Sequence, residues 1–188
     1  MSKPSDKLIE GCLKGKTGAQ KKLFECYRNA MLGICLRYVR DRMEAEDMML
    51  EGFVNIFRKM HTYAHKGSFE GWMKKTMVYS AIDYYRKYKK EKFHSNIDEH
   101  EDLIPEDPEI LHEIGAAELV QLISKLPAGY RQVFNLFAVE GYSHKEIAEL
   151  LGISENTSKS QYRKARHQLV SKLHKINEFE QKHEQNKI

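Results

Sequence analysis

The chain has 188 residues, which is enough for one large domain or two small ones. Charged residues make up 31% of it, yet the formal net charge is only +4, so any strongly basic surface must be local. Three cysteines without a Cys-x-x-Cys pair favour buried thiols in a reducing cytosol over a disulfide framework or a zinc site. We find no signal peptide before Leu8 and no apolar run of the ~18 residues that a membrane span requires, so we expect a cytoplasmic protein without direct membrane insertion.

Residues 1–93 predict a helical domain with a core of its own. Apolar residues recur at steps of three and four over residues 23–38, over 45–60 and, after a loop around 65–68, over 69–93. Almost no stretch alternates with the period of two that is typical of strands. We therefore predict an all-α fold. In the third of these helices the residues expected to face inward are Met73, Met77, Ala81, Tyr84 and Tyr88.

Residues 11–17, with the sequence GCLKGKT, imitate a phosphate-binding loop. That loop needs four residues between its first glycine and the Gly-Lys-Ser/Thr, whereas three residues separate Gly11 from Gly15. No strand precedes the segment and helical patterning surrounds it. A junction between helices is the better interpretation, with Gly18 and Ala19 leading into the next helix, and nucleotide binding is not expected.

The third helix, residues 69–93, also mixes aromatic rings with positive charge. Bases stack on aromatic rings while cations follow the phosphate backbone, so this surface is typical of single-stranded nucleic acid binding. The alternative is a core helix with inward rings and solvated lysines, and we expect that to hold for Trp72 and Tyr84. The stripe consists of Lys75, Tyr79, Asp83, Arg86 and Lys90, with Lys87 and Lys89 nearby.

Residues 94–115 differ in character from both flanks. Acidic residues are frequent there, Lys and Arg are absent, and Pro105 and Pro108 interrupt any helix. We predict a flexible or extended acidic linker between two small helical domains. Its histidines, His94, His100 and His112, share no helical face, so we expect no metal site.

Residues 116–188 predict a second helical domain with a polar tail that frays after Asn177. Within it, Ser143 is placed to cap a helix, and Glu146 three residues later completes a capping box. Gly152 suits the left-handed position past the end of that helix, and Ser154 can cap the next one. Two capped helices joined by a short Gly-containing turn form a helix-turn-helix, whose second helix reads the major groove of DNA.

The second helix of this motif has two chemically different sides. From Asn156 to Asn177 it carries six Lys or Arg and no Asp or Glu. Lys and Arg neutralise phosphates, while Asn, Ser and Arg can read base edges. The alternative is a solvated amphipathic helix, but capping, turn and charge together favour DNA binding. The side expected to be buried holds Ser158, Tyr162, Ala165, Leu169, Leu173 and Ile176.

Taken together, residues 8–173 resemble a bacterial sigma-70 family sigma factor of the extracytoplasmic-function (ECF) group, which keeps only the second and fourth conserved regions. EAEDMMLEGFVNIFRKM (44–60) resembles the helix that grips the polymerase clamp. FEGWMKKTMVYSAIDYYRK (69–87) resembles the promoter-melting helix that reads the −10 element. The stretch from LPAGYRQVF to RKARHQL (126–169) resembles the −35-reading region, and TSKSQ (157–161) resembles the Bacteroidetes branch.

The resemblance implies that residues 1–93 are region 2, 94–115 the linker and 116–188 region 4, in a non-enzyme without cofactor or metal. Polymerase contacts are expected at Glu46, Asp47, Glu51, Phe53 and Asn55. Contacts in −10 recognition and melting are expected at Tyr63, Phe69, Lys75, Tyr79, Asp83, Arg86, Lys87 and Lys90. Contacts with the −35 element are expected at Lys145, Ser154, Glu155, Asn156, Thr157, Lys159, Ser160, Arg163, Lys164 and Arg166.

The implied partners are core RNA polymerase, through the clamp and flap of its large subunits, promoter DNA and an anti-sigma factor, in the bacterial cytoplasm. The loop at residues 63–69 would receive one flipped base, and the acidic linker would follow the RNA path of the polymerase. The chain departs from the family pattern where Tyr79 replaces a frequent Asn, Ser158 a commonly apolar residue and Tyr162 a frequent Leu.

The alternative is a stand-alone helix-turn-helix transcriptional regulator with an N-terminal helical sensor domain. It explains residues 116–176 but leaves the aromatic and basic helix at 69–90 and the acidic linker unexplained. A helical interaction protein or NTPase is a third class, and it predicts neither DNA binding nor polymerase dependence.

Overall fold

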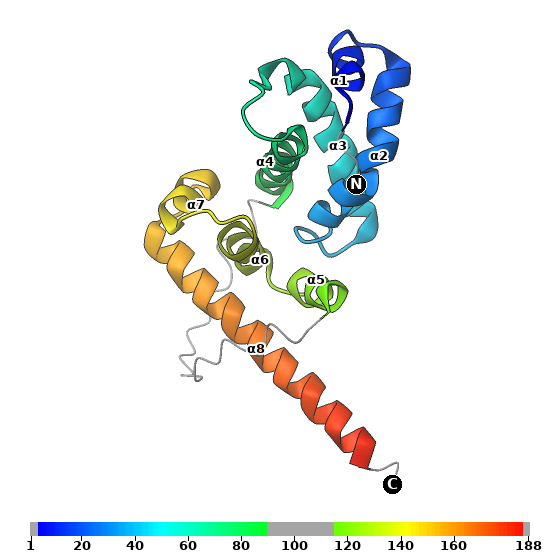
Figure 1. Cartoon of the computed structure of the whole chain (residues 1–188). Helices are drawn as coiled ribbons and strands as arrows, with labels where there is room; N and C mark the ends of the chain where they lie inside the picture. The colour runs from blue at the N-terminus through cyan, green and yellow to red at the C-terminus, as the bar shows by residue number, and fades with distance from the viewer. Residues whose placement is uncertain (1–3, 90–114, 186–188) are drawn as a thin grey trace. The chain divides into compact units, whose positions relative to one another are not determined.

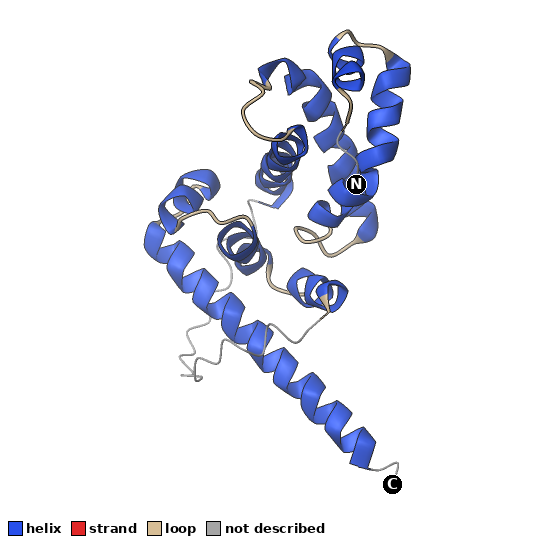
Figure 2. Cartoon of the chain, in the orientation of Figure 1, coloured by secondary structure: helices blue, strands red, loops and turns tan. Residues whose placement is uncertain are grey.

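A computed structural model describes residues 4–89 and 115–185, and within these ranges every regular element is a helix (Figure 2). The predicted all-α fold is therefore confirmed. The chain divides into two compact units, Met1–Lys90 and Glu91–Ile188, and each is described here by itself. The predicted linker lies outside the described residues, except for its last residue, Gly115.

The first unit is built from α1 (Asp6–Leu13), α2 (Thr17–Cys35), α3 (Arg42–Lys59), the short 3-10 turn η1 (Met60–Thr62) and α4 (Phe69–Lys89) (Figure 1). Side chains mark two of the helix starts. The Ser5 hydroxyl accepts a hydrogen bond from the Leu8 amide at 3.3 Å, and the Asp41 carboxylate accepts one from the Glu44 amide at 3.2 Å. Both are N-cap bonds, which satisfy amides that a helix leaves without partners.

The core of this unit lies between α2, α3 and α4. Its side chains are largely methionine and branched aliphatic residues. The Cβ-less Gly52 of α3 allows the close approach of buried Met77 from α4. Its large, almost fully buried side chains include Leu23, Met31, Met48, Ile56, Met60, Met73, Met77 and Ile82.

The inward stripe of α4 keeps strict steps of four and so differs from the prediction at its end. Met73, Met77 and Ala81 are buried as expected. The next inward residue is Tyr85, which is 5% exposed, while Tyr84 is only half-buried. The prediction took a step of three at this point, and the side chain of Tyr88 lies outside the described ones.

The segment that imitates a phosphate-binding loop is a junction between helices, as predicted. α1 ends at Leu13 and α2 begins at Thr17, so no strand and no phosphate-cradling loop is formed there. Gly15 makes the turn with a φ of 69°, a value that only glycine adopts without strain.

The second unit contains α5 (Ala116–Ser124), α6 (Ala128–Phe134), a π-helical turn η4 (Asn135–Val139), α7 (His144–Leu151) and the long α8 (Glu155–Gln185). Its apolar core joins α5, α6 and α8. Of the side of α8 predicted to be buried, Ser158, Ala165, Leu169 and Leu173 are buried, Tyr162 is half-buried, and the side chain of Ile176 lies outside the described ones. The core cluster consists of Leu122, Ile123, Leu126, Phe134, Ala165, Leu169 and Leu173, with Leu119, Tyr130 and Tyr162 against it.

Arg131 is the largest fully buried side chain among the described residues, at 1% exposure. Its guanidinium donates to the Ser124 carbonyl at 2.6 Å and to the Leu126 carbonyl at 3.4 Å. Carbonyls at a helix end have no partner within the helix. Arg131 therefore ties the end of α5 to α6 and stabilises the frame on which α8 rests.

The predicted fraying after Asn177 was wrong over most of the tail, because α8 continues to Gln185. No Gly or Pro follows Gly152, and residues 177–185 are rich in Glu, Gln and Lys, which are good helix formers. The helix therefore continues beyond Ile176, where the apolar stripe used for the prediction ends.

We expect Gly52→Ala to lower the free energy of unfolding by about 1–3 kcal/mol. The new Cβ would overlap the sulfur and methyl group of Met77, whose burial prevents it from swinging away. Chemical denaturation followed by circular dichroism measures the change. Gly33→Ala on α2 is the matched control: nothing lies within 4 Å of its added Cβ, so stability should stay equal or rise by up to ~1 kcal/mol. Equal effects of the two substitutions would contradict the close packing.

Candidate nucleic-acid interface

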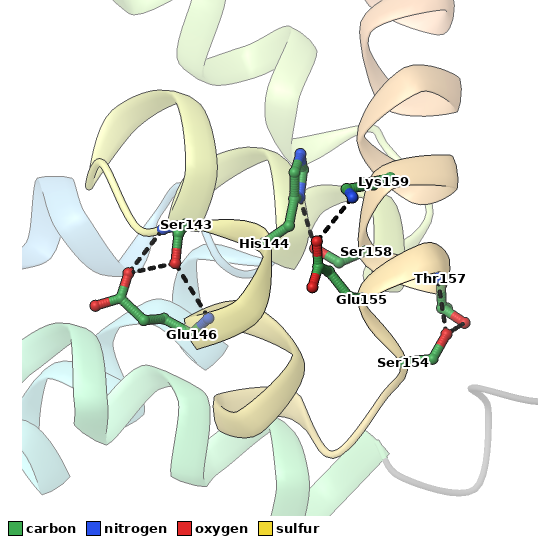
Figure 3. A network of polar contacts seen from close by, with 8 residues as sticks. All are labelled: Ser143, His144, Glu146, Ser154, Glu155, Thr157, Ser158 and Lys159. Carbon is green, nitrogen blue, oxygen red and sulfur yellow. Dashed lines mark hydrogen bonds and ion pairs between the residues drawn. The ribbon is translucent and has the colours of Figure 1, made fainter.

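The two helices of the predicted helix-turn-helix begin and end as their sequence signals require (Figure 3). The Ser143 hydroxyl accepts from the Glu146 amide at 3.3 Å, while the Glu146 carboxylate accepts from the Ser143 amide at 2.8 Å. Gly152 ends α7 with φ 68° and ψ 39°. The Ser154 hydroxyl then accepts from the Thr157 amide at 2.9 Å and caps α8. The capping box, the left-handed glycine and the second cap are confirmed.

One side of α8 is buried in the core and the opposite side carries most of the predicted −35 residues. Arg163 lies in the middle of the exposed side, whereas Thr157, Lys164 and Arg166 are half-buried at its margins. The exposed members are Ser154, Glu155, Asn156, Lys159, Ser160 and Arg163, and Lys145 is exposed on α7. The structure thus brings the exposed members from Ser154 to Arg163 together on one surface, which we call the α8 face, with Lys145 of α7 exposed as well.

An ion pair lies at the N-terminal end of the α8 face. The Lys159 ammonium lies 2.7 Å from a Glu155 carboxylate oxygen (Figure 3). This hydrogen bond and charge lower the pKa of Glu155. Both side chains are about half exposed, and an exposed pair of this spacing adds little to the stability of a helix. The pair can therefore open at little cost when a phosphate or a base edge competes for Lys159.

A polar contact joins α7 to α8 beneath the α8 face. The sequence alone did not predict this contact. The Nδ1 of His144 lies 2.9 Å from the hydroxyl of Ser158, a residue with no exposed surface. The His144 ring stacks on Phe137 of η4, with centroids 4.2 Å apart and planes 10° from parallel. Burial lowers the pKa of His144, nearby Lys159 lowers it further, and Glu155 opposes the shift.

In the first unit, α4 displays the predicted mixture of rings and cations. Lys75, Asp83, Arg86 and Lys87 are exposed, and Tyr79 is half-buried. The Lys75 ammonium lies 6.0 Å from the centre of the Tyr79 ring, so charge and ring are offered side by side. Arg86 and Asp83 lie 4.0 Å apart. Lys90 lies outside the described residues, as does the side chain of Lys89.

The loop before α4 is held by an aromatic cluster. The Tyr63 hydroxyl donates to the Gly67 carbonyl at 2.9 Å, and its ring meets Phe69 edge-on at 5.1 Å. Phe69 stacks on Trp72 at 5.6 Å, and the half-buried Trp72 faces partly inward, as expected. Phe69 is only 5% exposed and packs against the ring of Tyr63, and its predicted contact with DNA stays a prediction.

On α3 the predicted polymerase contacts divide into exposed and buried residues. Asp47 and Glu51 are exposed, and Glu46 is half-buried. Asn55 is half-buried and donates to the Ser80 hydroxyl of α4 at 3.0 Å. Phe53 is 3% exposed and its ring packs edge-on against Phe24 at 4.8 Å, so it lies in the core of the unit, and its predicted polymerase contact stays a prediction.

Sequence reasoning also missed an apolar stripe on the outside of α3. Met43, Leu50 and Val54 are 73%, 51% and 62% exposed, respectively. Their spacing of seven and four residues places them on one side of the helix. A row of exposed apolar side chains beside exposed carboxylates is typical of a protein-binding surface. The periodicity of the outer residues was the signal that could have found it.

Comparison with known proteins identifies the class. The sigma-70 region 2 family model matches residues 23–91, and the sigma-70 region 4 model matches residues 116–169, together about two thirds of the chain. The chain belongs to the sigma-70 family, and its relatives place it in the ECF group. The Bacteroidetes-like interpretation of residues 157–161 stays a prediction.

Two relatives illustrate the similarity. The chain is 29% identical over 156 residues to the ECF RNA polymerase sigma factor SigM of Bacillus subtilis, covering 79% of this chain and 91% of SigM. It is 26% identical over 182 residues to the ECF RNA polymerase sigma factor SigE of Mycolicibacterium smegmatis, covering 92% and 70%. A solved structure of the sigma factor RpoE in complex with the anti-sigma factor NepR from Bartonella quintana is also similar, with a TM-score of 0.48 and 18% sequence identity. The match covers 83% of this chain and 96% of the chain in that structure.

The described residues contain no helix that is both long enough and apolar enough to cross a membrane. In the same residues, no group of three or more His, Cys, Asp or Glu side chains could hold a metal ion.

We expect acid to destabilise the wild-type chain more than His144→Phe. Because the pKa of folded His144 lies below its ordinary value of 6.5, the unfolded chain binds the proton more readily. The stability contributed by neutral His144 is therefore complete above about pH 6.5 and is lost as the pH falls through the window below it. Denaturant unfolding of the full chain from about pH 7.5 to about pH 5 measures both slopes. Parallel slopes for the two proteins would contradict the desolvated state of His144.

Proposed function

We propose that this ECF sigma factor binds core RNA polymerase, directs it to specific promoters and initiates transcription by reading two promoter elements and opening the strands between them. Residues 1–93 act on the polymerase and the −10 element, and residues 116–188 act on the −35 element. The observation that carries the proposal is the α8 face, a cationic surface on the second helix of a capped helix-turn-helix whose opposite side is buried. The matches to regions 2 and 4 support the same division.

At the −35 element, α8 would enter the major groove with its N-terminal turns. Lys159, Ser160 and Arg163 are the residues we propose for contacts at or near base edges, because they are exposed on the first three turns of α8. Lys145, Lys164 and Arg166 lie to the sides and would bind phosphates.

At the −10 element, α4 and the loop before it would hold bases that have left the stack. Unstacking costs a few kcal/mol per base, and stacking on rings together with charge on the backbone can supply it. Tyr79 with Lys75 offers one such position. Tyr63, half-exposed and supported by Phe69 and Trp72, offers another in the loop.

In this proposal, the outer side of α3 binds the polymerase. The exposed carboxylates of Asp47 and Glu51 flank the apolar stripe of Met43, Leu50 and Val54. The flap would meet the second unit, and the acidic linker would follow the RNA path. An anti-sigma factor is a further partner proposed from the family resemblance alone. The bacterial cytoplasm, where core polymerase transcribes, is the proposed location.

No observation favours the alternative of a stand-alone regulator. It treats the first unit as a sensor domain, whereas the region 2 model matches that unit from residue 23 onward. A sensor domain would also leave unexplained the half-buried Tyr79 ring beside the exposed cations of α4. Nothing in the described residues points to an enzyme active site, and we propose that the chain acts without catalysis of its own.

Arg163→Ala should relax the preference at one −35 position by about 1–3 kcal/mol, because a guanidinium that reads a base edge cannot be replaced by a methyl group. In-vitro transcription with core polymerase from a promoter set that varies each −35 base measures this preference. Lys164→Ala is the control, since loss of a phosphate contact should weaken all promoters alike. An unchanged base preference in Arg163→Ala would show that α8 sits in a different register.

Leu50→Gln combined with Val54→Gln should weaken binding to core polymerase at least about tenfold, because two exposed apolar anchors would be lost from one patch. Binding is measured by titrating fluorescently labelled chain with core enzyme. Leu13→Gln is the matched control, as Leu13 is an apolar residue of similar exposure (47%) on α1. If the double variant and Leu13→Gln weaken binding to core polymerase equally, the stripe on α3 is not the docking surface.

A further inference from the structure

The hydrogen bond between His144 and Ser158 joins the first turn of α7 to the first turns of α8 (Figure 3). His144 is the first residue of α7, directly after the cap Ser143. Ser158 lies one turn into α8, four residues after the cap Ser154, on the buried side of the helix beneath the α8 face. The contact therefore lies where the two helices of the DNA-reading motif meet.

Three residues from two elements hold the imidazole in one orientation. One face of the ring lies flat on Phe137 of η4. Tyr162 of α8 lies beside it, with centroids 5.9 Å apart. The edge of the ring then presents Nδ1 to Ser158, whose hydroxyl is fully buried. A ring fixed in this way keeps Nδ1 within hydrogen-bond distance of the hydroxyl, and a buried hydroxyl without a partner is destabilising.

A directional bond constrains α8 in a way that an apolar contact does not. Apolar packing restrains a helix through the fit of its side chains but sets no bond angle. A hydrogen bond weakens steeply when its geometry departs from the preferred range. The bond between His144 and Ser158 therefore adds a directional restraint on the rotation of α8 where the starts of the two helices meet.

Rotation matters because the proposed base contacts are neighbours of Ser158 along the same turns. Lys159 and Ser160 follow it directly, and Arg163 lies five residues on. Side-chain tips stand about 5–6 Å from a helix axis, so a rotation of about 20° moves them by roughly 2 Å. A displacement of that size is enough to break a hydrogen bond to a base edge.

We propose that His144 is a positioning residue for −35 recognition, whose hydrogen bond to Ser158 fixes the rotation of α8 and thereby sets which bases the α8 face prefers. The inference rests on the proposed function and adds to it a determinant of specificity that touches no DNA. His144 would act through Ser158 alone, so both partners should give the same phenotype when they are changed.

Four substitutions separate positioning from simple stability. His144→Phe keeps a ring on Phe137 but removes the hydrogen bond, and Ser158→Ala removes the bond from the other side. His144→Asn places an amide where Nδ1 stands and should restore the bond. His144→Gln places its amide about one bond further out, near the position of Nε2, and is the matched control that should not restore it.

The readout is in-vitro transcription by each full-length variant with the host's core polymerase. The template is a promoter library randomised in the −35 element with a constant −10 element, and the transcripts are sequenced. We expect His144→Phe and Ser158→Ala to lower the preference for the best base at one or more −35 positions by about fivefold. The double variant should show no further change, because one bond is lost in all three. His144→Asn should stay close to wild type, and His144→Gln should resemble His144→Phe.

Several outcomes would overturn the inference. A uniform loss of transcription with unchanged −35 preference would assign His144 a merely structural role. If His144→Asn and His144→Gln gave the same −35 preference, the effect would not depend on the hydrogen bond at the Nδ1 position. A library randomised at −10 serves as the internal control, and an altered preference there would also count against positioning. If the wild-type chain starts no transcript from any member of the library, it is the proposed function that fails.

Discussion

Burial of one side of α8 under α5 and α6 is the interaction on which the DNA-reading unit depends. Ala165, Leu169 and Leu173 enter a shared core, so the basic residues on the opposite side are left facing solvent. The polar contact at Ser158 adds the restraint on rotation that we propose for α8. Arg131 supports this arrangement, because its bond to the end of α5 holds the two supporting helices, α5 and α6, together.

The two units present different chemistry to nucleic acid. The α8 face is a row of polar and cationic side chains on a straight helix, a shape that suits the major groove of intact duplex. The first unit instead offers rings, with Tyr79 beside Lys75 and Tyr63 supported by Phe69 and Trp72. Rings recognise bases that have already left the stack. In our proposal, duplex reading and strand capture therefore belong to separate surfaces, and the apolar stripe on α3 is a third surface for a protein partner.

Local signals were predictable from the sequence, and tertiary pairings were not. The capping box at Ser143, the turn at Gly152 and the cap at Ser154 depend on residues within four positions of one another, and all three were predicted. The pairing of His144 with Ser158 spans fourteen residues and depends on the angle between two helices. Phe53 shows the same limit: a family motif indicated its helix, but only the packing against Phe24 shows that its ring is buried. Periodicity also failed at the end of α4, where steps of three and four were both compatible with the sequence.

The central claim is that the two DNA-reading surfaces act on one promoter only when core polymerase joins them. Footprinting of the purified chain on a target promoter, with and without core enzyme, tests it most directly. We predict protection over both the −35 and the −10 elements, with reactive unpaired bases at −10, only when core polymerase is present. Equal protection of the −35 element by the chain alone, without any change at −10 on adding core enzyme, would contradict the account and indicate a regulator that binds duplex unaided.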